Sequence, residues 1–205
     1  MIRAAVEKLG FKFTDIKILL NSHAHPDHTT GDAMIKELTG ATVMAMAEDV
    51  PALQNIRPGG KAHPIDRVLH DGDTVTLGGM TLTAHLTPGH TKGCTTWTLK
   101  VPDSGKTYDV VIVGSPNVND GFKLVNNPRY PRIADDYARS FRVWKSLPCD
   151  VFLGAHGNYY GMQEKYQKLQ SGSGNPFIDP AGYRAYIAER QQAFETNLQK
   201  QRAGE

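Results

Sequence analysis

The residues best suited to chemistry lie in the segment "NSHAHPDHTTG" at positions 21–31. Six consecutive positions hold three of the chain's eight histidines and one aspartate, namely His23, His25, Asp27 and His28. Imidazole and carboxylate groups are ligands that suit Zn²⁺, and a string of this kind arises by chance in roughly one chain in a thousand. The segment therefore predicts a metal site in preference to a polar loop that happens to be rich in histidine.

Two further histidines follow predicted strands. His90 stands in "LTPGHT", where Pro88 and Gly89 allow a tight turn, and His156 stands in "LGAHG" at the end of an apolar strand. Taken alone, each is as readily a turn or packing residue as a ligand. Beside the histidine cluster, both are better explained as metal ligands.

The other three histidines give a weaker signal. His63 and His70 lie in the polar segment "GGKAHPIDRVLHDGD", and His85 falls at a solvent-facing position of a predicted strand. We interpret all three as surface or packing residues.

The number of predicted ligands indicates how many metal ions the site holds. Five histidines and one aspartate are too many for one tetrahedral zinc that keeps an open catalytic position. Six ligands divide naturally as three and three, over two metal ions that share a bridging hydroxide. Such a pair generates a nucleophile at neutral pH and stabilises both the attacked oxygen and the leaving group, so the sequence predicts a hydrolase.

The apolar periodicity indicates the elements that must position these ligands. It predicts strands at 16–22, 41–47, 94–101, 108–115 and 149–156, a hairpin at 74–87 that turns at Gly78-Gly79, and helices at 2–9, 32–38, 133–147 and from Pro180 onward with Asp179 as N-cap. Strands interspersed with helices predict an α/β layered fold, in a single domain over residues 1–205. The predicted ligands fall at strand ends, where sites usually lie.

Composition excludes several classes. Apolar residues make up 40% of the chain, and a formal charge of +2 is spread without a basic run, which gives no support for nucleic-acid binding. No apolar run approaches the roughly 18 residues that span a bilayer, which argues against a membrane protein, and "MIRAAVEKLGFKF" is no signal peptide. Cys94 and Cys149 fit either a bridge or two buried thiols, and the apolar runs around them favour thiols.

The order "HAHPDH", "TPGHT", "GAHG" resembles the metallo-β-lactamase superfamily. Longer segments such as "LTAHLTPGHTKGCTTWT" and "GNPFIDPAGYRAYIAERQQAF" resemble its subclass B3 over nearly the whole chain. The resemblance implies an αββα sandwich with the zinc site at the strand ends, a periplasmic location, and hydrolysis of small-molecule β-lactams that confers antibiotic resistance.

The resemblance also implies roles for individual residues. It places two Zn²⁺ ions, the first on His23, His25 and His90, and the second on Asp27, His28 and His156. The bridging hydroxide would attack the β-lactam carbonyl while Asp27 orients it. Ser115 would lie close to the second zinc as a further catalytic residue, and Asn117 would bind the substrate carboxylate.

Two alternatives stay open. Glyoxalase II and lactonases of the superfamily place a metal-bridging aspartate at the end of the strand where this chain has Ser115, which favours a lactamase over a lactone or thioester hydrolase. The other alternative is a truncated zinc-binding relative with little or no activity.

The front of the chain departs from the resemblance. Met1 falls where a B3 enzyme is already in the first helix of its mature domain, so we expect a sandwich that is N-terminally truncated relative to the family. The strand at 16–22 would then have an open edge. We therefore expect a homo-oligomer that covers the missing N-terminal half-sheet.

Overall fold

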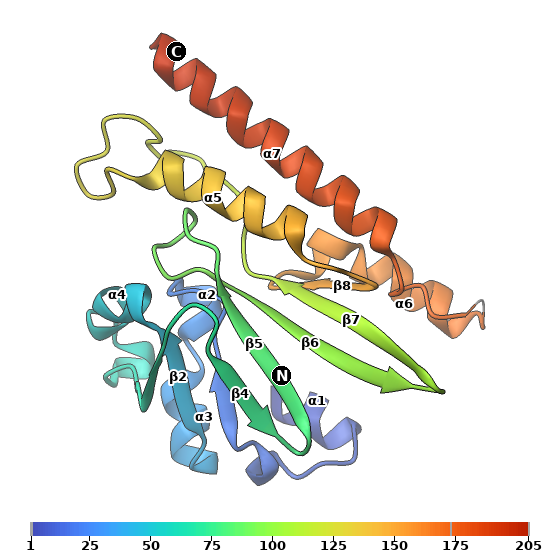
Figure 1. The fold of residues 1–205 in the computed structure, drawn as a ribbon. Helices are drawn as coiled ribbons and strands as arrows, with labels where there is room; N and C mark the ends of the chain where they lie inside the picture. Colours follow the sequence, from blue (N-terminus) through green and yellow to red (C-terminus); the bar gives the residue numbers. More distant parts are fainter. Residues whose placement is uncertain (1, 173, 205) are drawn as a thin grey trace.

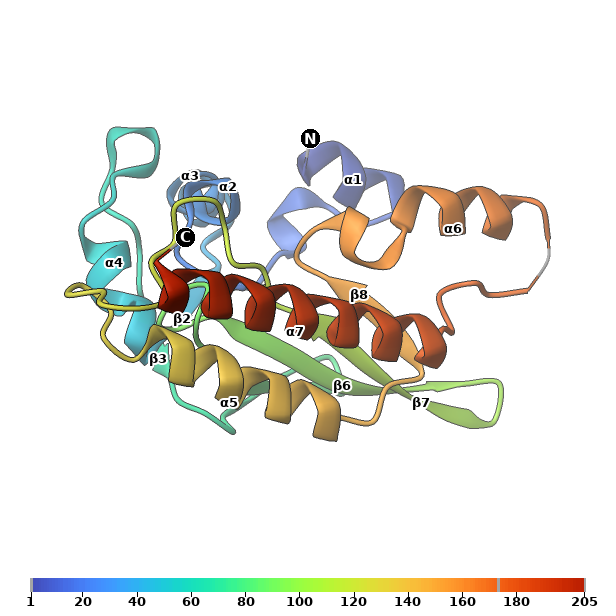
Figure 2. The same cartoon turned by 90° about the horizontal axis from the view of Figure 1, so that it is seen from above.

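Two β-sheets and the helices outside them form the layers of the molecule. A computed structural model describes residues 2–172 and 174–204. Helices α5 (Ile133–Ser146) and α7 (Pro180–Ala203) run side by side over one face of the larger sheet (Figures 1 and 2). The smaller sheet and helices α2 to α4 lie on the other side (Figure 1). The predicted α/β layered fold is confirmed.

The smaller sheet is parallel and carries the front of the metal-ligand motif. Its strand order is β1 (Ile18–Leu20), β2 (Thr42–Met46) and β3 (Arg67–Leu69). Strand β2 pairs on both sides and is almost wholly buried, which explains its continuous apolar sequence. The prediction of a strand over 16–22 was too long, because β1 pairs with β2 alone and only over three residues.

The larger sheet has the strand order β4 (Thr74–Leu77), β5 (Met80–Leu86), β6 (Thr95–Asp103), β7 (Lys106–Val113) and β8 (Val151–Gly154). The first four strands are antiparallel neighbours, and β8 joins β7 in parallel after the crossover through α5. The predicted hairpin is confirmed, and both of its turn glycines have positive φ angles, 58° at Gly78 and 81° at Gly79. This arrangement sends β5, β7 and β8 toward one edge.

The main core lies between the larger sheet and the two helices that cover it. Helix α7 begins as predicted, with the Asp179 carboxylate accepting a hydrogen bond from the Gly182 N–H at 2.8 Å. The buried residues of this core are Val111, Val113, Leu124, Ile133, Tyr137, Phe141, Trp144, Phe152, Tyr159, Tyr183, Ile187 and Phe194. A second core fills the space between the sheets, and its buried residues are Met44, Met46, Leu69, Val75, Ala84, Leu86 and Trp97.

Several short elements were not predicted from the sequence. They are α2 (Pro26–Thr29), α4 (Val50–Gln54), α6 (Met162–Gln170), strand β3, and the 3₁₀ turns Phe13–Asp15, Ala47–Asp49, Pro58–Gly60 and Gly157–Tyr160. The predicted N-terminal and central helices are present as α1 (Ile2–Lys8), which is followed by the positive-φ residue Gly10, and α3 (Asp32–Thr39). Short segments carry too few apolar repeats to show a period, so their conformation depends on tertiary contacts.

The two cysteines are free, and Cys94 is fully buried while Cys149 is half-buried. The bridge alternative is therefore wrong, and burial raises the pKa of each thiol to about 12. Among the described residues, no helix is long and apolar enough to cross a membrane.

Candidate metal centre

The loops that follow β1, β5 and β8 bring the six predicted ligands together. His23, His25, Asp27 and His28 follow β1, while His90 and His156 come from the loops after β5 and β8. Within the first loop, Pro26 occupies the first helical position of α2, and His25 is its extended N-cap residue. The ligands fall into two groups, each with its ligand atoms within 4.8 Å of one another and each able to hold a metal ion.

The first group, which we call the buried triad, consists of His23, His25 and His90. The ring centroids of His25 and His23 lie 4.8 Å apart, and each of these rings lies 4.6 Å from the His90 ring. His23 and His90 are buried and His25 is half-buried. Three imidazoles thus face one another at the floor of the site.

The second group, the open triad, consists of Asp27, His28 and His156. The Nε2 atoms of His28 and His156 lie 3.1 Å apart, and Asp27 Oδ2 lies 3.2 Å from the first and 3.6 Å from the second. Ligands about 2.0–2.1 Å from a tetrahedral zinc lie roughly 3.3 Å from one another, so the observed spacing fits one ion. The side chains of Asp27 and His156 are 59% and 41% exposed, so this group opens to solvent.

The protonation of the buried histidines also fits a metal. Burial, with smaller contributions from neighbouring imidazoles, lowers the pKa of His23 to about 2. Burial likewise lowers the pKa of His90 to about 4, and it lowers the pKa of His28. These rings are therefore neutral at pH 7 with a lone pair available, and the buried His23 Nε2 has no hydrogen-bond partner. An unpaired buried acceptor among neutral imidazoles is what a Zn²⁺ site requires.

Ser22 links the two triads. Its Oγ lies 3.0 Å from His23 Nδ1 and 3.3 Å from His28 Nδ1. A hydroxyl oxygen has two lone pairs, so Ser22 can accept a hydrogen bond from both Nδ1–H groups and leave both Nε2 atoms free for metal. Ser22 was not among the residues predicted from the sequence, although its place directly before the motif was a usable signal.

His90 is fixed by the loop that follows β7. Its Nδ1–H donates to the Asn117 carbonyl oxygen at 2.9 Å, and the Tyr137 hydroxyl donates to the same oxygen at 2.6 Å. This contact leaves His90 Nε2 for the metal. Gly89, at φ 133°, passes so close to Tyr137 that a Cβ would lie 2.6 Å from its ring. The predicted tight turn at Pro88-Gly89 is therefore enforced by packing as well as by backbone conformation.

Ser115 and Asn117 meet at the hydroxyl of Tyr159. Ser115 Oγ lies 3.1 Å from that hydroxyl, and Asn117 Nδ2 donates to it at 3.2 Å. Ser115 is fully buried, so it faces the interior beside the site, whereas Asn117 is half-buried. The catalytic role of Ser115 and the substrate-binding role of Asn117 stay predictions, and Tyr159 is a neighbour that the sequence analysis missed.

The three histidines that the sequence analysis set aside lie in neither triad. His63 Nε2 lies 2.8 Å from the Asp32 carboxylate in a buried pair, and His85 Nε2 lies 2.8 Å from the Thr98 hydroxyl. His70 is exposed. Their interpretation as surface or packing residues agrees with these positions.

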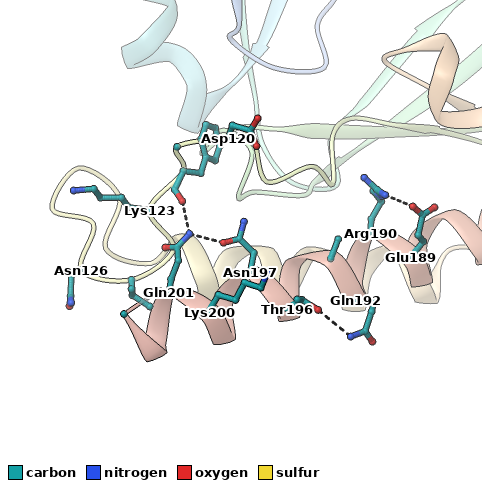
Figure 3. A pocket seen from close by; sticks show the side chains of 15 residues that line it. Asp120, Lys123, Asn126, Glu189, Arg190, Gln192, Thr196, Asn197, Lys200 and Gln201 are labelled. Atoms are coloured by element: carbon teal, nitrogen blue, oxygen red, sulfur yellow. Dashed lines mark hydrogen bonds and ion pairs between the residues drawn. The ribbon is translucent and has the colours of Figure 1, made fainter.

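A groove of about 1240 Å³ lies between α7 and the loop at 118–127 (Figure 3). The loop is tied to the helix through the Gln201 side chain, which donates to the Phe122 carbonyl at 2.8 Å and accepts from the Leu124 N–H at 2.7 Å. The Phe122 ring lies 5.9 Å from the His90 ring. The same loop therefore forms a wall of the groove and a neighbour of the buried triad.

The fold and these ligands define a known class of protein. The sequence profile of the metallo-beta-lactamase superfamily matches residues 2–156, so the chain belongs to this superfamily. The FEZ-1 metallo-beta-lactamase from Legionella gormanii is 49% identical with a TM-score of 0.94, over 98% of this chain and 81% of that chain. BJP-1, a subclass B3 metallo-beta-lactamase of Bradyrhizobium japonicum, is 42% identical with a TM-score of 0.89, over 99% of this chain and 80% of that chain. The expected metallo-β-lactamase fold and the resemblance to subclass B3 are confirmed.

Curated relatives carry other names. Hydroxyacylglutathione hydrolase of Hyphomonas neptunium is 40% identical over 44% of this chain and 30% of its own length. Persulfide dioxygenase ETHE1 of Homo sapiens is 26% identical over 53% of this chain and 37% of its own length. The chain thus spans about a third of these curated relatives. The comparisons support a hydrolase of the superfamily that acts on a small molecule.

Proposed function

We propose that the chain is a subclass B3 metallo-β-lactamase that hydrolyses the amide bond of β-lactams with two zinc ions. The single observation that carries the proposal is the close match to B3 enzymes over nearly the whole chain. The chain is 42% identical to BJP-1, and the match covers 99% of this chain. The two triads supply a complete ligand set for two ions. Zinc, when bound, lowers the pKa of water and polarises a carbonyl oxygen.

The chain's own residues contribute orientation and proton handling. The hydrogen bonds at the Nδ1 atoms of His23, His28 and His90 hold the rings with Nε2 turned toward the centre of the site. The Asp27 carboxylate would accept a hydrogen bond from the attacking water through the oxygen that does not bind the metal and would align it with the carbonyl carbon, because it is the exposed acidic group of the open triad. The C–N bond of the ring then breaks, the water oxygen stays on the carbonyl carbon, and the nitrogen takes up a proton.

The test is β-lactam hydrolysis by zinc-loaded protein, measured with nitrocefin before and after chelation. We expect turnover that chelation abolishes and added zinc restores. Asp27→Ala should lower kcat/KM by more than about a hundredfold, since partners outside the ligand shell alone contribute ten- to hundredfold. Asp103→Asn, on the exposed end of β6, is the matched carboxylate control and should retain full activity. Full nitrocefin turnover by Asp27→Ala protein would contradict the proposal.

A thioester hydrolase is the second candidate, and the names of the curated relatives favour it. A residue just after β7 argues against it, because Ser115 stands where the family resemblance implies a metal-bridging aspartate in such enzymes. A glutathione thioester assayed beside nitrocefin separates the two. Zinc-dependent thioester cleavage without β-lactam turnover would establish the second candidate. Zinc binding with neither activity would favour a zinc-binding relative with little or no activity.

We also propose a periplasmic location, a role in antibiotic resistance and a homo-oligomer. The surface that favours association is helix α6, which differs from the half-sheet expected from the sequence: Met162, Tyr166 and Leu169 recur on one helical face and are 48%, 49% and 42% exposed. Sedimentation should show a mass above that of the monomer, which Leu169→Glu reduces and Leu77→Glu, on strand β4, does not. Cell fractionation and susceptibility to β-lactams of a host that expresses the chain test the other two.

A further inference from the structure

A buried carboxylate joins the two loops that carry the buried triad. Asp49 ends the 3₁₀ turn after β2 and precedes α4, in the sequence "AEDVPAL". An aspartate directly before a Val-Pro pair predicts an N-cap residue. The structure shows no cap hydrogen bond from its side chain, which turns inward instead and is only 3% exposed.

All of the carboxylate's hydrogen bonds go to the ligand loops. Asp49 Oδ2 accepts from the Ala24 N–H at 2.9 Å and from the Thr91 hydroxyl at 2.8 Å, and Oδ1 accepts from the Gly93 N–H at 2.7 Å. Ala24 lies between His23 and His25, and Thr91 follows His90 directly. One side chain therefore holds the backbone between His23 and His25 and also the loop that follows His90.

The loop after His90 packs closely against Asp49 at Gly93. A Cβ at Gly93 would lie 2.5 Å from the Asp49 backbone nitrogen, so glycine is needed for the loop to reach the carboxylate. Burial raises the pKa of Asp49 although its three hydrogen bonds oppose the shift. Among the described residues Asp49 forms no ion pair, so these three hydrogen bonds must offset the cost of burying its carboxylate.

We propose that Asp49 is a positioning residue that sets the spacing of His23, His25 and His90 and thereby the zinc affinity of the buried triad. The inference rests on the metal-binding part of the proposed function. The ligands of the open triad make no hydrogen bond to Asp49. His28 contacts Ser22 and His156, and Asp27 contacts His156.

The experiment measures zinc affinity in two backgrounds by competition with a chromophoric chelator. His156→Ala protein keeps the buried triad intact, and His90→Ala protein keeps the open triad intact. Asparagine has only one acceptor oxygen, so Asp49→Asn must lose at least one of the three hydrogen bonds. We expect it to weaken zinc binding about ten- to hundredfold in the first background and less than about threefold in the second.

Further variants keep the outcome interpretable. Thr91→Val removes one donor while the carboxylate stays, and it should weaken the buried triad several-fold. Asp66→Asn is the control, because its carboxylate also accepts a backbone N–H, that of Val43, but contacts neither ligand loop. A purely structural Asp49 would lower the melting temperature of the metal-free protein and leave both affinities unchanged.

The inference is overturned if Asp49→Asn and Thr91→Val bind zinc like their parents, or if both triads weaken equally. If the Asp49 variant fails to fold, Thr91→Val alone decides between these outcomes. Absence of β-lactam turnover with a selective change in affinity would overturn the proposed function and leave the role of Asp49 standing. Normal β-lactam turnover by the parent protein, with zinc affinities that the Asp49 and Thr91 variants leave unchanged, would support the proposed function and overturn the role of Asp49.

Discussion

The two triads differ in how much protein surrounds them. In the buried triad, His23 and His90 are 3% and 7% exposed, and a serine, a backbone carbonyl and a buried carboxylate hold their loops. In the open triad, Asp27 and His156 have much of their side chains in solvent. Ligands that are held in place before binding lose less freedom when a metal binds. We therefore expect the buried triad to bind zinc more tightly, and the open triad to face the substrate.

The largest expected effect is the loss of a ligand from the buried triad. His90→Ala should abolish tight zinc binding there and lower β-lactam turnover by more than about a hundredfold, beyond the effect of an outer-shell change. His156→Ala should lower turnover too, but should keep one tightly bound zinc. Metal content after dialysis, measured beside kcat/KM, checks both. Equal retention of zinc by the two variants would show that burial does not set the affinity.

The buried triad should also make the stability of the metal-free protein depend on pH. The pKa values of His23 and His90 fall from 6.5 to about 2 and about 4 on folding. Well above pH 6.5 both rings are neutral in the folded and unfolded chains. As the pH falls below that value, the two rings bind protons in the unfolded chain but stay neutral in the folded chain. The free energy of unfolding therefore decreases by about 1.4 kcal/mol per pH unit for each ring, as long as the pH stays above the pKa of that ring in the folded chain.

Urea unfolding of metal-free protein between pH 7 and pH 4 measures this slope. In His90→Gln protein the slope should be smaller, because one of the two buried imidazoles is gone. An unchanged slope in that variant would contradict the assignment of the effect to the buried triad.

Two glycines beside the ligands test how rigidly each triad is packed. Gly89→Ala places a methyl group 2.6 Å from the Tyr137 ring and also strains a φ of 133°, so it should cost about 1–3 kcal/mol and weaken zinc binding. Gly157→Ala, beside His156, meets the Met162 side chain, with its terminal methyl carbon at 2.9 Å and its Cβ at 3.2 Å, at a backbone conformation open to any residue, and should cost less, about 1 kcal/mol. Thermal melting of both variants, with zinc titration, decides whether the difference holds.

The smallest expected effect concerns the groove wall. Gln201→Ala releases the loop at 118–127 that places Phe122 beside His90. KM should rise about fivefold, the equivalent of one net hydrogen bond, while zinc affinity stays unchanged. Gln192→Ala is the control on the same helix, because its side chain contacts Thr196 and not the loop (Figure 3). A change in zinc affinity with Gln201→Ala would show that the loop supports the metal site itself.

Long, periodic elements were predictable from the sequence. The Gly78-Gly79 hairpin and helix α7 with its Asp179 cap follow from local patterns, and the structure confirms them. Helix α6 and strand β3 were not predicted, because a few residues with no clear period leave the choice to their neighbours in space. The ligand types at the strand ends were equally readable, since four of them fall within six consecutive positions and His90 and His156 each follow a predicted strand.

By itself, the sequence determined which side chains are able to bind zinc and that they follow strands. Only the tertiary structure decided which of them are buried, which ring nitrogen is left free, and what holds the loops. Those properties depend on contacts between distant positions, such as Asp49 with Gly93 or His90 with Asn117. Asp49 illustrates the limit most clearly: locally it is an N-cap residue, and its actual hydrogen bonds exist only once the turn after β2 meets both ligand loops.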